Sequence, residues 1–295
     1  MNNFYSKNQL GTYCKVILLS VSMFFLSLQI EAQVTSDGNV QFQSAASTTV
    51  TMSGFSVPAG SNSVLVVYSC GFLALATNVT FDGTPLTLLQ NSTGGVSLSI
   101  WYLALGDLAS PSVGDIVATY GNYVVATHTI HAVSYQNADQ STPMSEFAQN
   151  AFGGGTSSSI SVNSSDANDL IVDFIVARSN DSTTPTLTEG AGQTKIGEQT
   201  NQQSAGGLVS TIALSEEPSP GSAVDMDWTI AYGTTGVNTS MQVAAKINAV
   251  SSGSGPVSNS IPTLSEWGLI ILALLFMTFG TLYLVQPNVE EKLGR

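Results

Sequence analysis

From about residue 50 to residue 250, short runs rich in Val, Ile, Thr and aromatic residues are separated by Gly, Pro, Asn and Ser. This composition and spacing are typical of β-strands joined by turns. No long segment of this region has the 3.6-residue periodicity of an amphipathic helix. The predicted strands are 50–57, 64–69, 97–104, 115–120, 124–135, 169–177, 207–214, 224–231 and 240–250. The pattern predicts an all-β fold, an antiparallel β-sandwich or jelly-roll-like domain.

Residues 79–88 have the pattern of a hairpin, because Asp82-Gly83 can adopt the positive φ angles of a tight turn. A weak internal repeat also runs through the region. The segment 106–116 has a counterpart in 215–226, and Thr119-Tyr120-Gly121 is echoed by Ala231-Tyr232-Gly233.

The repeat is consistent with two immunoglobulin-sized domains or with one sandwich of pseudo-symmetric halves, at about 40–136 and 157–250. The Gly/Ser-rich stretch 153–159 between them is interpreted as a loop. We therefore predict one β domain over residues 33–250.

The N-terminal segment has the order of a secretory signal peptide. Lys7 and Lys15 precede an apolar stretch at 16–28, and Ala32 supplies a small residue before a cleavage point. We predict a signal peptide at 1–32 and a mature chain that begins near Gln33.

The C-terminal segment predicts one transmembrane helix. After a Ser/Gly linker at 251–260, residues 268–285 carry no charge and would span about 27 Å as a helix, close to the thickness of a bilayer's hydrocarbon core. Trp267 and Tyr283 suit the two interfaces, and Lys292 and Arg295 favour a cytoplasmic C-terminus. This orientation places the β domain outside the cytoplasmic membrane.

A short motif precedes this helix: Ile261, Pro262, Thr263, Leu264, Trp267 and Gly268. It resembles the IPTL-CTERM sorting signal, a relative of the PEP-CTERM signals. The resemblance implies an exosortase-like membrane protease as partner, with 261–295 as the signal. The tail departs from the family pattern, because Glu290 and Glu291 dilute its positive charge. The alternative is a membrane anchor that no enzyme cleaves.

The segments 57–67, 81–87 and 101–103 resemble a module of bacterial exported and surface proteins, a family to which no chemistry is assigned. The resemblance spans most of residues 40–250 and implies a role at the cell surface. We expect an exported structural or adhesive protein of the cell envelope or extracellular matrix.

Charge and cysteine content narrow the classes of function. The formal net charge is −13, and Arg178, Lys195 and Lys246 are the basic residues of 33–250. Such a chain has almost nothing with which to neutralise phosphates, so no nucleic-acid partner is expected. Cys70 is the one cysteine after the signal peptide, so the exported domain must be held by its core, and a buried thiol is predicted.

Few residues suggest a ligand site. Trp101 and Trp228 could stack on a surface glycan, which would make the domain a carbohydrate-binding module, although core positions suit them as well. Asp225 and Asp227 share a strand face and could hold Ca²⁺ or serve a secreted carboxylate-dependent hydrolase. Exposed acidic strand positions explain them more simply.

The remaining candidates favour structure over catalysis. Asp166 and Asp169 flank Asn168 before a strand and suit either a Ca²⁺ loop or a turn. His128 and His131, three apart on a strand, should point to opposite faces, one packed and one solvated, and so form no metal pair. We expect no enzyme activity and no cofactor.

Overall fold

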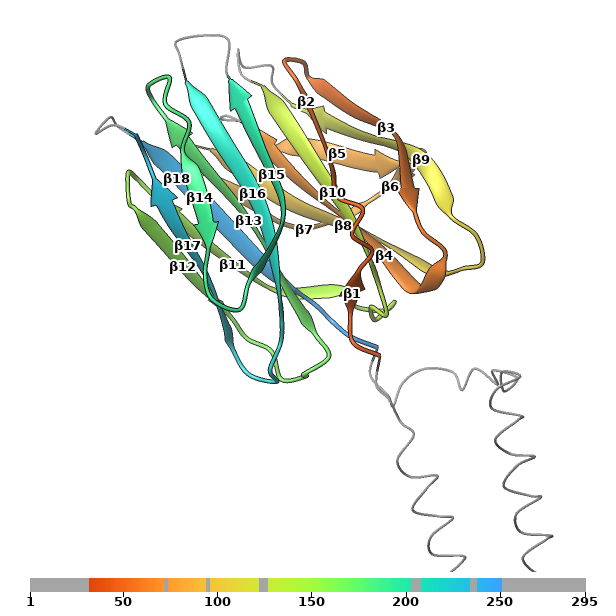
Figure 1. Cartoon of the computed structure of the whole chain (residues 1–295). Helices are drawn as coiled ribbons and strands as arrows, with labels where there is room; N and C mark the ends of the chain where they lie inside the picture. The colour runs from red at the N-terminus through yellow and green to blue at the C-terminus, as the bar shows by residue number, and fades with distance from the viewer. Residues whose placement is uncertain are drawn as a thin grey trace, which may run out of the picture. The chain divides into compact units, whose positions relative to one another are not determined.

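The computed structural model describes residues 32–250, except 72–73, 94–95, 122–126, 203–207 and 234–237 (Figure 1). All regular elements among these residues are β-strands, and all paired strands run antiparallel. The prediction of an all-β, antiparallel fold is confirmed. Within the described residues, no helix is long and apolar enough to cross a membrane. The expected signal-peptide segment up to residue 31, the linker 251–260 and the sorting signal with its helix lie outside the described residues.

The strands of the first half of the chain form two sheets. Sheet 1 places β1 (Thr35–Ser36) and β2 (Gln41–Ala45) beside β10 (His128–Gln136), followed by β4 (Gly60–Gly71), β8 (Ser97–Leu108) and β7 (Thr87–Thr93). Sheet 2 has the order β3 (Thr49–Val57), β9 (Ser112–Tyr120), β5 (Ala76–Phe81) and β6 (Thr84–Pro85).

The second half forms two more sheets. Sheet 3 has the order β11 (Met144–Phe152), β18 (Thr239–Ile247), β13 (Leu170–Ser179), β16 (Val209–Pro218) and β15 (Thr194–Gln202). Sheet 4 has the order β12 (Ser157–Val162), β17 (Val224–Ala231) and β14 (Thr186–Glu189).

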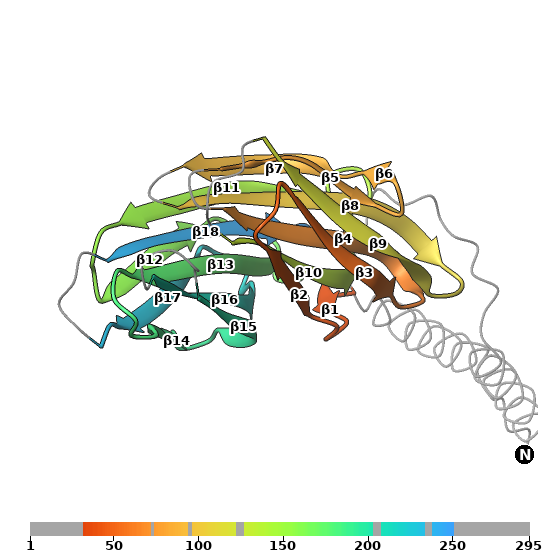
Figure 2. The same ribbon diagram turned by 90° about the horizontal axis from the view of Figure 1, so that it is seen from above.

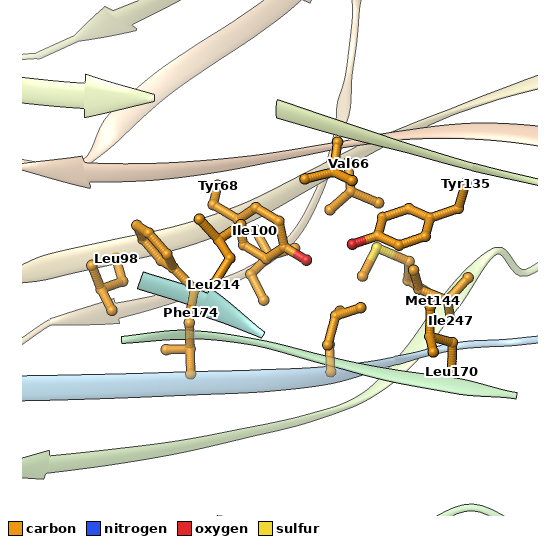
Figure 3. Packing of buried hydrophobic residues seen from close by; sticks show 14 of the residues in the cluster. Val66, Tyr68, Leu98, Ile100, Tyr135, Met144, Leu170, Phe174, Leu214 and Ile247 are labelled. Carbon is orange, nitrogen blue, oxygen red and sulfur yellow. The ribbon is translucent and has the colours of Figure 1, made fainter. Parts of the chain in front are cut away.

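The four sheets stack in layers, in the order 2, 1, 3, 4 (Figure 2). One apolar cluster lies between sheets 1 and 2, and two smaller ones lie between sheets 3 and 4. The largest cluster lies between sheets 1 and 3 and draws side chains from both halves (Figure 3). The Tyr68 and Phe174 rings, for example, meet there with centroids 5.4 Å apart. Residues of both halves therefore share one central core, within one compact unit.

The two halves have the same strand order. In sheet 1 the path β2-β10-β4-β8-β7 corresponds to β11-β18-β13-β16-β15 in sheet 3. In sheet 2 the path β3-β9-β5 corresponds to β12-β17-β14 in sheet 4. The weak sequence repeat follows this correspondence, since Tyr120 ends β9 and Tyr232 follows β17. Strand β11 lies between the two ranges at which the repeat was placed, and it pairs with β18 of the second half.

Two local expectations are only partly met. Asp82 and Gly83 have φ angles of 47° and 77° and close the expected turn, but β6 pairs with β5 over two residues only. From Thr87 the chain passes into sheet 1 as β7, so residues 87–88 belong to another layer. Residues 157–159 were expected in a loop and instead open β12. Strand β12 alternates exposed serines with buried Ser158 and Ile160, and it pairs with β17. This pairing is a tertiary contact that a Ser-rich sequence does not predict.

Candidate functional site

Both ends of the described chain meet at one end of the fold. The Asn137 side-chain amide donates a hydrogen bond to the Gln33 carbonyl oxygen (3.0 Å), and the Val250 N–H donates to the Asn137 carbonyl (3.1 Å). The Val34 N–H donates to the Asn168 carbonyl (3.0 Å). Residues just after the expected signal cleavage therefore lie beside residues just before the linker.

The Asp169 carboxylate fixes the C-terminal side of this arrangement. One of its oxygens accepts the Ala249 N–H (2.9 Å), and the other accepts the Ser164 hydroxyl (2.8 Å). The Lys246 ammonium lies 3.4 Å from the same second oxygen, and both side chains of this ion pair are largely buried. Charge-assisted bonds in a buried position hold the end of β18 and the residues after it.

We call this set of contacts the terminal clasp: Asn137, Asn168 and Asp169, with Gln33, Val34, Ala249 and Val250. Asp166 supports it as a turn residue, because its carboxylate accepts the Asn168 backbone N–H at 2.9 Å. In the segment 166–169, which the sequence offered as a Ca²⁺ loop, the Asp166 and Asp169 carboxylates instead accept backbone N–H groups. The Asp169 carboxylate is also bonded to Ser164 and Lys246. Among the described residues, no group of three His, Cys, Asp or Glu side chains is placed to hold a metal ion.

The two tryptophans that could have stacked on a glycan lie in the cores. Trp101 packs in the cluster between sheets 1 and 2, and its indole N–H donates to the Ser99 hydroxyl (3.0 Å). Trp228 is 1% exposed between sheets 3 and 4. A buried ring presents no face to a sugar, so these two residues offer no stacking platform.

Asp225 and Asp227 occupy the outward positions of β17, whose residues alternate between buried and exposed. They share the outer face of sheet 4, as the alternation predicted. The nearby Glu217 carboxyl has its pKa raised, mainly by burial and further by the negative charges of these two aspartates. The two aspartates therefore act on Glu217 by charge repulsion, and within the described part of the chain these three carboxylates are not placed to share a metal ion.

The two histidines point to opposite faces of β10, as expected. The prediction that one of them is solvated is wrong, since both are fully buried. His128 stacks on Tyr120 (centroids 4.0 Å apart, 8° between planes), towards sheet 2. His131 lies between Phe42 and Phe174, and burial lowers its pKa to about 3. Covering sheet 1 on both sides buries both faces of this strand.

Cys70 is a free, buried thiol, as predicted. Burial raises its pKa to about 12, which leaves almost no thiolate at neutral pH. The position suits packing between sheets 1 and 3.

A buried carboxylate that the sequence reasoning missed lies between sheets 3 and 4. Asp173 is fully buried in β13 and accepts hydrogen bonds from the Trp228 indole N–H (2.6 Å), the Gln242 amide (2.7 Å) and the Ser215 hydroxyl (2.5 Å). Burial raises its pKa to about 6, and the three donors oppose this rise. The available signal was one acidic residue inside the apolar run from Leu170 to Val176. The Asp173 carboxylate has no exposed surface, and its hydrogen-bond donors are side chains of strands β16, β17 and β18.

Comparison with known proteins identifies one feature. The family model described as "IPTL-CTERM motif" matches residues 259–282, which include the six motif residues singled out above. No curated protein and no solved structure gives a significant match to the chain. The chain is thus identified as carrying an IPTL-CTERM motif, which supports an exported protein with a C-terminal sorting signal.

Proposed function

We propose that this chain is a structural or adhesive protein of the cell envelope or extracellular matrix, delivered there through its C-terminal sorting signal. The observation that carries the proposal is the IPTL-CTERM match at 259–282, which follows a β fold whose described residues are hydrogen-bonded as far as Val250. A sorting signal must be reached by membrane machinery, so a signal outside the folded unit suits that use.

The proposed partner is an exosortase-like membrane protease that recognises residues 261–268. The uncharged segment 268–285 holds the precursor in the membrane, with the β domain outside. The linker 251–260 separates the domain from the motif. From its Ser/Gly-rich sequence alone, a reach of about 17 Å is expected, at 5–6 Å times the square root of its length. The terminal clasp supports this division, because it fixes the chain up to Val250, the residue before the linker.

The proposed work of the domain is mechanical and needs no catalysis. Each half is a jelly-roll-like sandwich, with its strands in the orders 1-8-3-6-5 and 2-7-4 when numbered within the half. The two sandwiches are fused through a shared apolar core, so the domain needs no disulfide to resist unfolding. Among the described residues with reactive or titratable side chains at its centre, His131 and Asp173 are fully buried and Cys70 is 7% exposed.

The test follows the fate of the C-terminus in cells. The intact mass of the protein is measured from envelope and culture-medium fractions for the wild type and for a variant with Pro262, Thr263 and Trp267 changed to Ala. The matched control changes Ser251, Ser252 and Ser254 to Ala, which replaces three linker residues before the matched segment.

Sorting predicts a wild-type and control product that ends near the motif and lacks the helix, while the motif variant keeps its tail and stays in the membrane. Wild-type protein that retains Arg295 in every fraction would overturn processing and leave a permanently anchored surface domain.

A further inference from the structure

We propose that the mature N-terminus is modified: after signal-peptide removal, Gln33 closes on itself to form a pyroglutamyl lactam. The inference rests on the export proposed above, with cleavage after Ala32. It concerns the opposite end of the chain from the sorting signal and does not require that signal to be processed.

The fold holds the main chain at Gln33 and Val34, near the start of the described residues. Val34 is 2% exposed in the central core, and its N–H donates to the Asn168 carbonyl. The Gln33 carbonyl accepts the Asn137 side-chain amide at 3.0 Å. Cleavage beyond Gln33 would remove this bond from the terminal clasp, whereas cleavage after Ala32 leaves the clasp complete.

The groups that react are the ones the fold leaves available. Ala32 and Gln33 are exposed, and among the described residues the Gln33 carbonyl is the atom of this residue that takes part in a hydrogen bond. Among the described residues, neither the backbone nitrogen nor the side-chain amide of Gln33 is hydrogen-bonded. Once the peptide bond between Ala32 and Gln33 is cut, the new α-amine and the side-chain amide of Gln33 are both exposed to water. They belong to the same residue, so rotation of the side chain brings them together.

The reaction balances without a co-reactant. The neutral α-amine of Gln33 attacks the side-chain carboxamide carbon, a C–N bond closes a five-membered lactam, and the bond from that carbon to Nε2 breaks. Ammonia leaves, carrying the proton that the amine loses. An α-amino group has a pKa of about 8, so an appreciable fraction is in the reactive neutral form near neutral pH.

The product fits the clasp. The lactam forms between the amine and the side chain, so the main-chain carbonyl that accepts from Asn137 is unchanged. The ring stays at an exposed position, where it displaces no packed atom. The modified terminus carries no charge and offers no free amine to aminopeptidases, which suits a protein that persists outside the cell.

The experiment is intact-mass and N-terminal peptide mass spectrometry of the full-length protein secreted by cells, prepared cold and without prolonged incubation. A matched variant, Gln33→Glu, keeps the length of the side chain but cyclises far more slowly, because hydroxide is a poorer leaving group than ammonia. The proposal expects a wild-type peptide that starts at residue 33 and has lost the mass of one ammonia, and a variant with a free amine.

Each other outcome overturns the proposal in a distinguishable way. A wild-type peptide that starts at Gln33 with a free amine removes cyclisation and leaves export intact. A mature chain that starts elsewhere removes the cleavage point as well, and an N-terminus at Met1 in every fraction removes the export proposed above. Equal urea unfolding of both proteins is expected, since the clasp uses only the carbonyl of residue 33.

Discussion

The two halves share one strand order but bury different polar groups beneath their tryptophans. In the first half, the Trp101 indole N–H bonds to Ser99, whose hydroxyl lies 2.5 Å from that of Ser69. In the second half, the Trp228 indole N–H bonds to the Asp173 carboxylate. The acceptor of the first indole is therefore a hydroxyl, whereas the acceptor of the second is an ionisable carboxyl group. The fold tolerates either solution because each buried indole N–H finds an acceptor.

The halves also differ in how pH should act on them. His131, in the first half, has its pKa lowered to about 3, and Asp173, in the second, has its pKa raised to about 6. Burial is the main cause in both, since it disfavours the charged form. A histidine is charged at low pH and an aspartate at high pH, so the two groups should make stability slope in opposite directions.

The largest expected effect comes from removing the carboxylate. Asp173→Ala leaves the Trp228 indole N–H and one of the two Gln242 amide N–H groups buried without an acceptor, because the Gln242 amide keeps only its bond to the Met226 carbonyl. At about 1–3 kcal/mol for each unsatisfied donor, we expect a loss of about 5 kcal/mol in the free energy of unfolding. Urea denaturation at neutral pH measures it. A loss no larger than that of the Ser99 variant described below would show that the two networks are energetically alike.

His131 should dominate on the acid side. Its folded pKa of about 3 lies below the unfolded value of 6.5, so the unfolded chain binds more protons between these values. The free energy of unfolding should therefore decrease as the pH is lowered below about 6.5, and at about pH 3.5 the decrease should be about 4 kcal/mol. Comparing urea midpoints of the wild type and His131→Leu across this range isolates the histidine. Parallel curves for the two proteins would contradict the assignment.

Asp173 should act with the opposite sign. Its folded pKa of about 6 lies above the unfolded 3.8, so the folded state binds the proton more tightly. Its contribution is complete below about pH 4 and is lost as pH rises to about 6, a change of about 3 kcal/mol. Burial raises the pKa of Glu216 to about 7, so this residue should also make the free energy of unfolding decrease as the pH rises. The difference between the wild type and Asp173→Asn isolates Asp173, and that difference should vary with pH.

The smallest effect is expected in the neutral network. Ser99→Ala removes the acceptor of the Trp101 N–H and the partner of Ser69, and we expect a loss of about 1–2 kcal/mol. Because Ser69, Ser99 and Trp101 do not titrate between pH 4 and pH 7, and burial raises the pKa of the neighbouring Tyr120 far above this range, the loss should be the same at both values. A loss that changes with pH would show that the first half is coupled to an ionisable group.

Part of the fold could be predicted because β-branched residues and turn residues act locally. The Asp82-Gly83 turn and the alternation of β17 were readable from the chain, and so was the burial of Cys70. The serine-rich start of β12 and the full burial of both histidines were not. Both depend on what lies across the sheet, which residue types along one strand do not encode.

The candidate sites divide in the same way. The motif at 261–268 was recognisable because it is a short linear segment, and the family match confirms it. The role of Asp169 required the structure, since its partners Ser164, Lys246 and Ala249 come together only when the strands are paired.

The sequence by itself determined an antiparallel all-β chain with a C-terminal sorting signal, because strand propensity, turns and a linear motif are properties of neighbouring residues. The tertiary structure alone decided the four-layer stack, the shared core of the two halves and the acceptors of the buried donors. An apolar run such as Leu170–Val176 states that both faces of a strand are covered, but not by which sheets, because apolar contact is non-directional. Hydrogen-bond geometry between distant strands then fixed one arrangement.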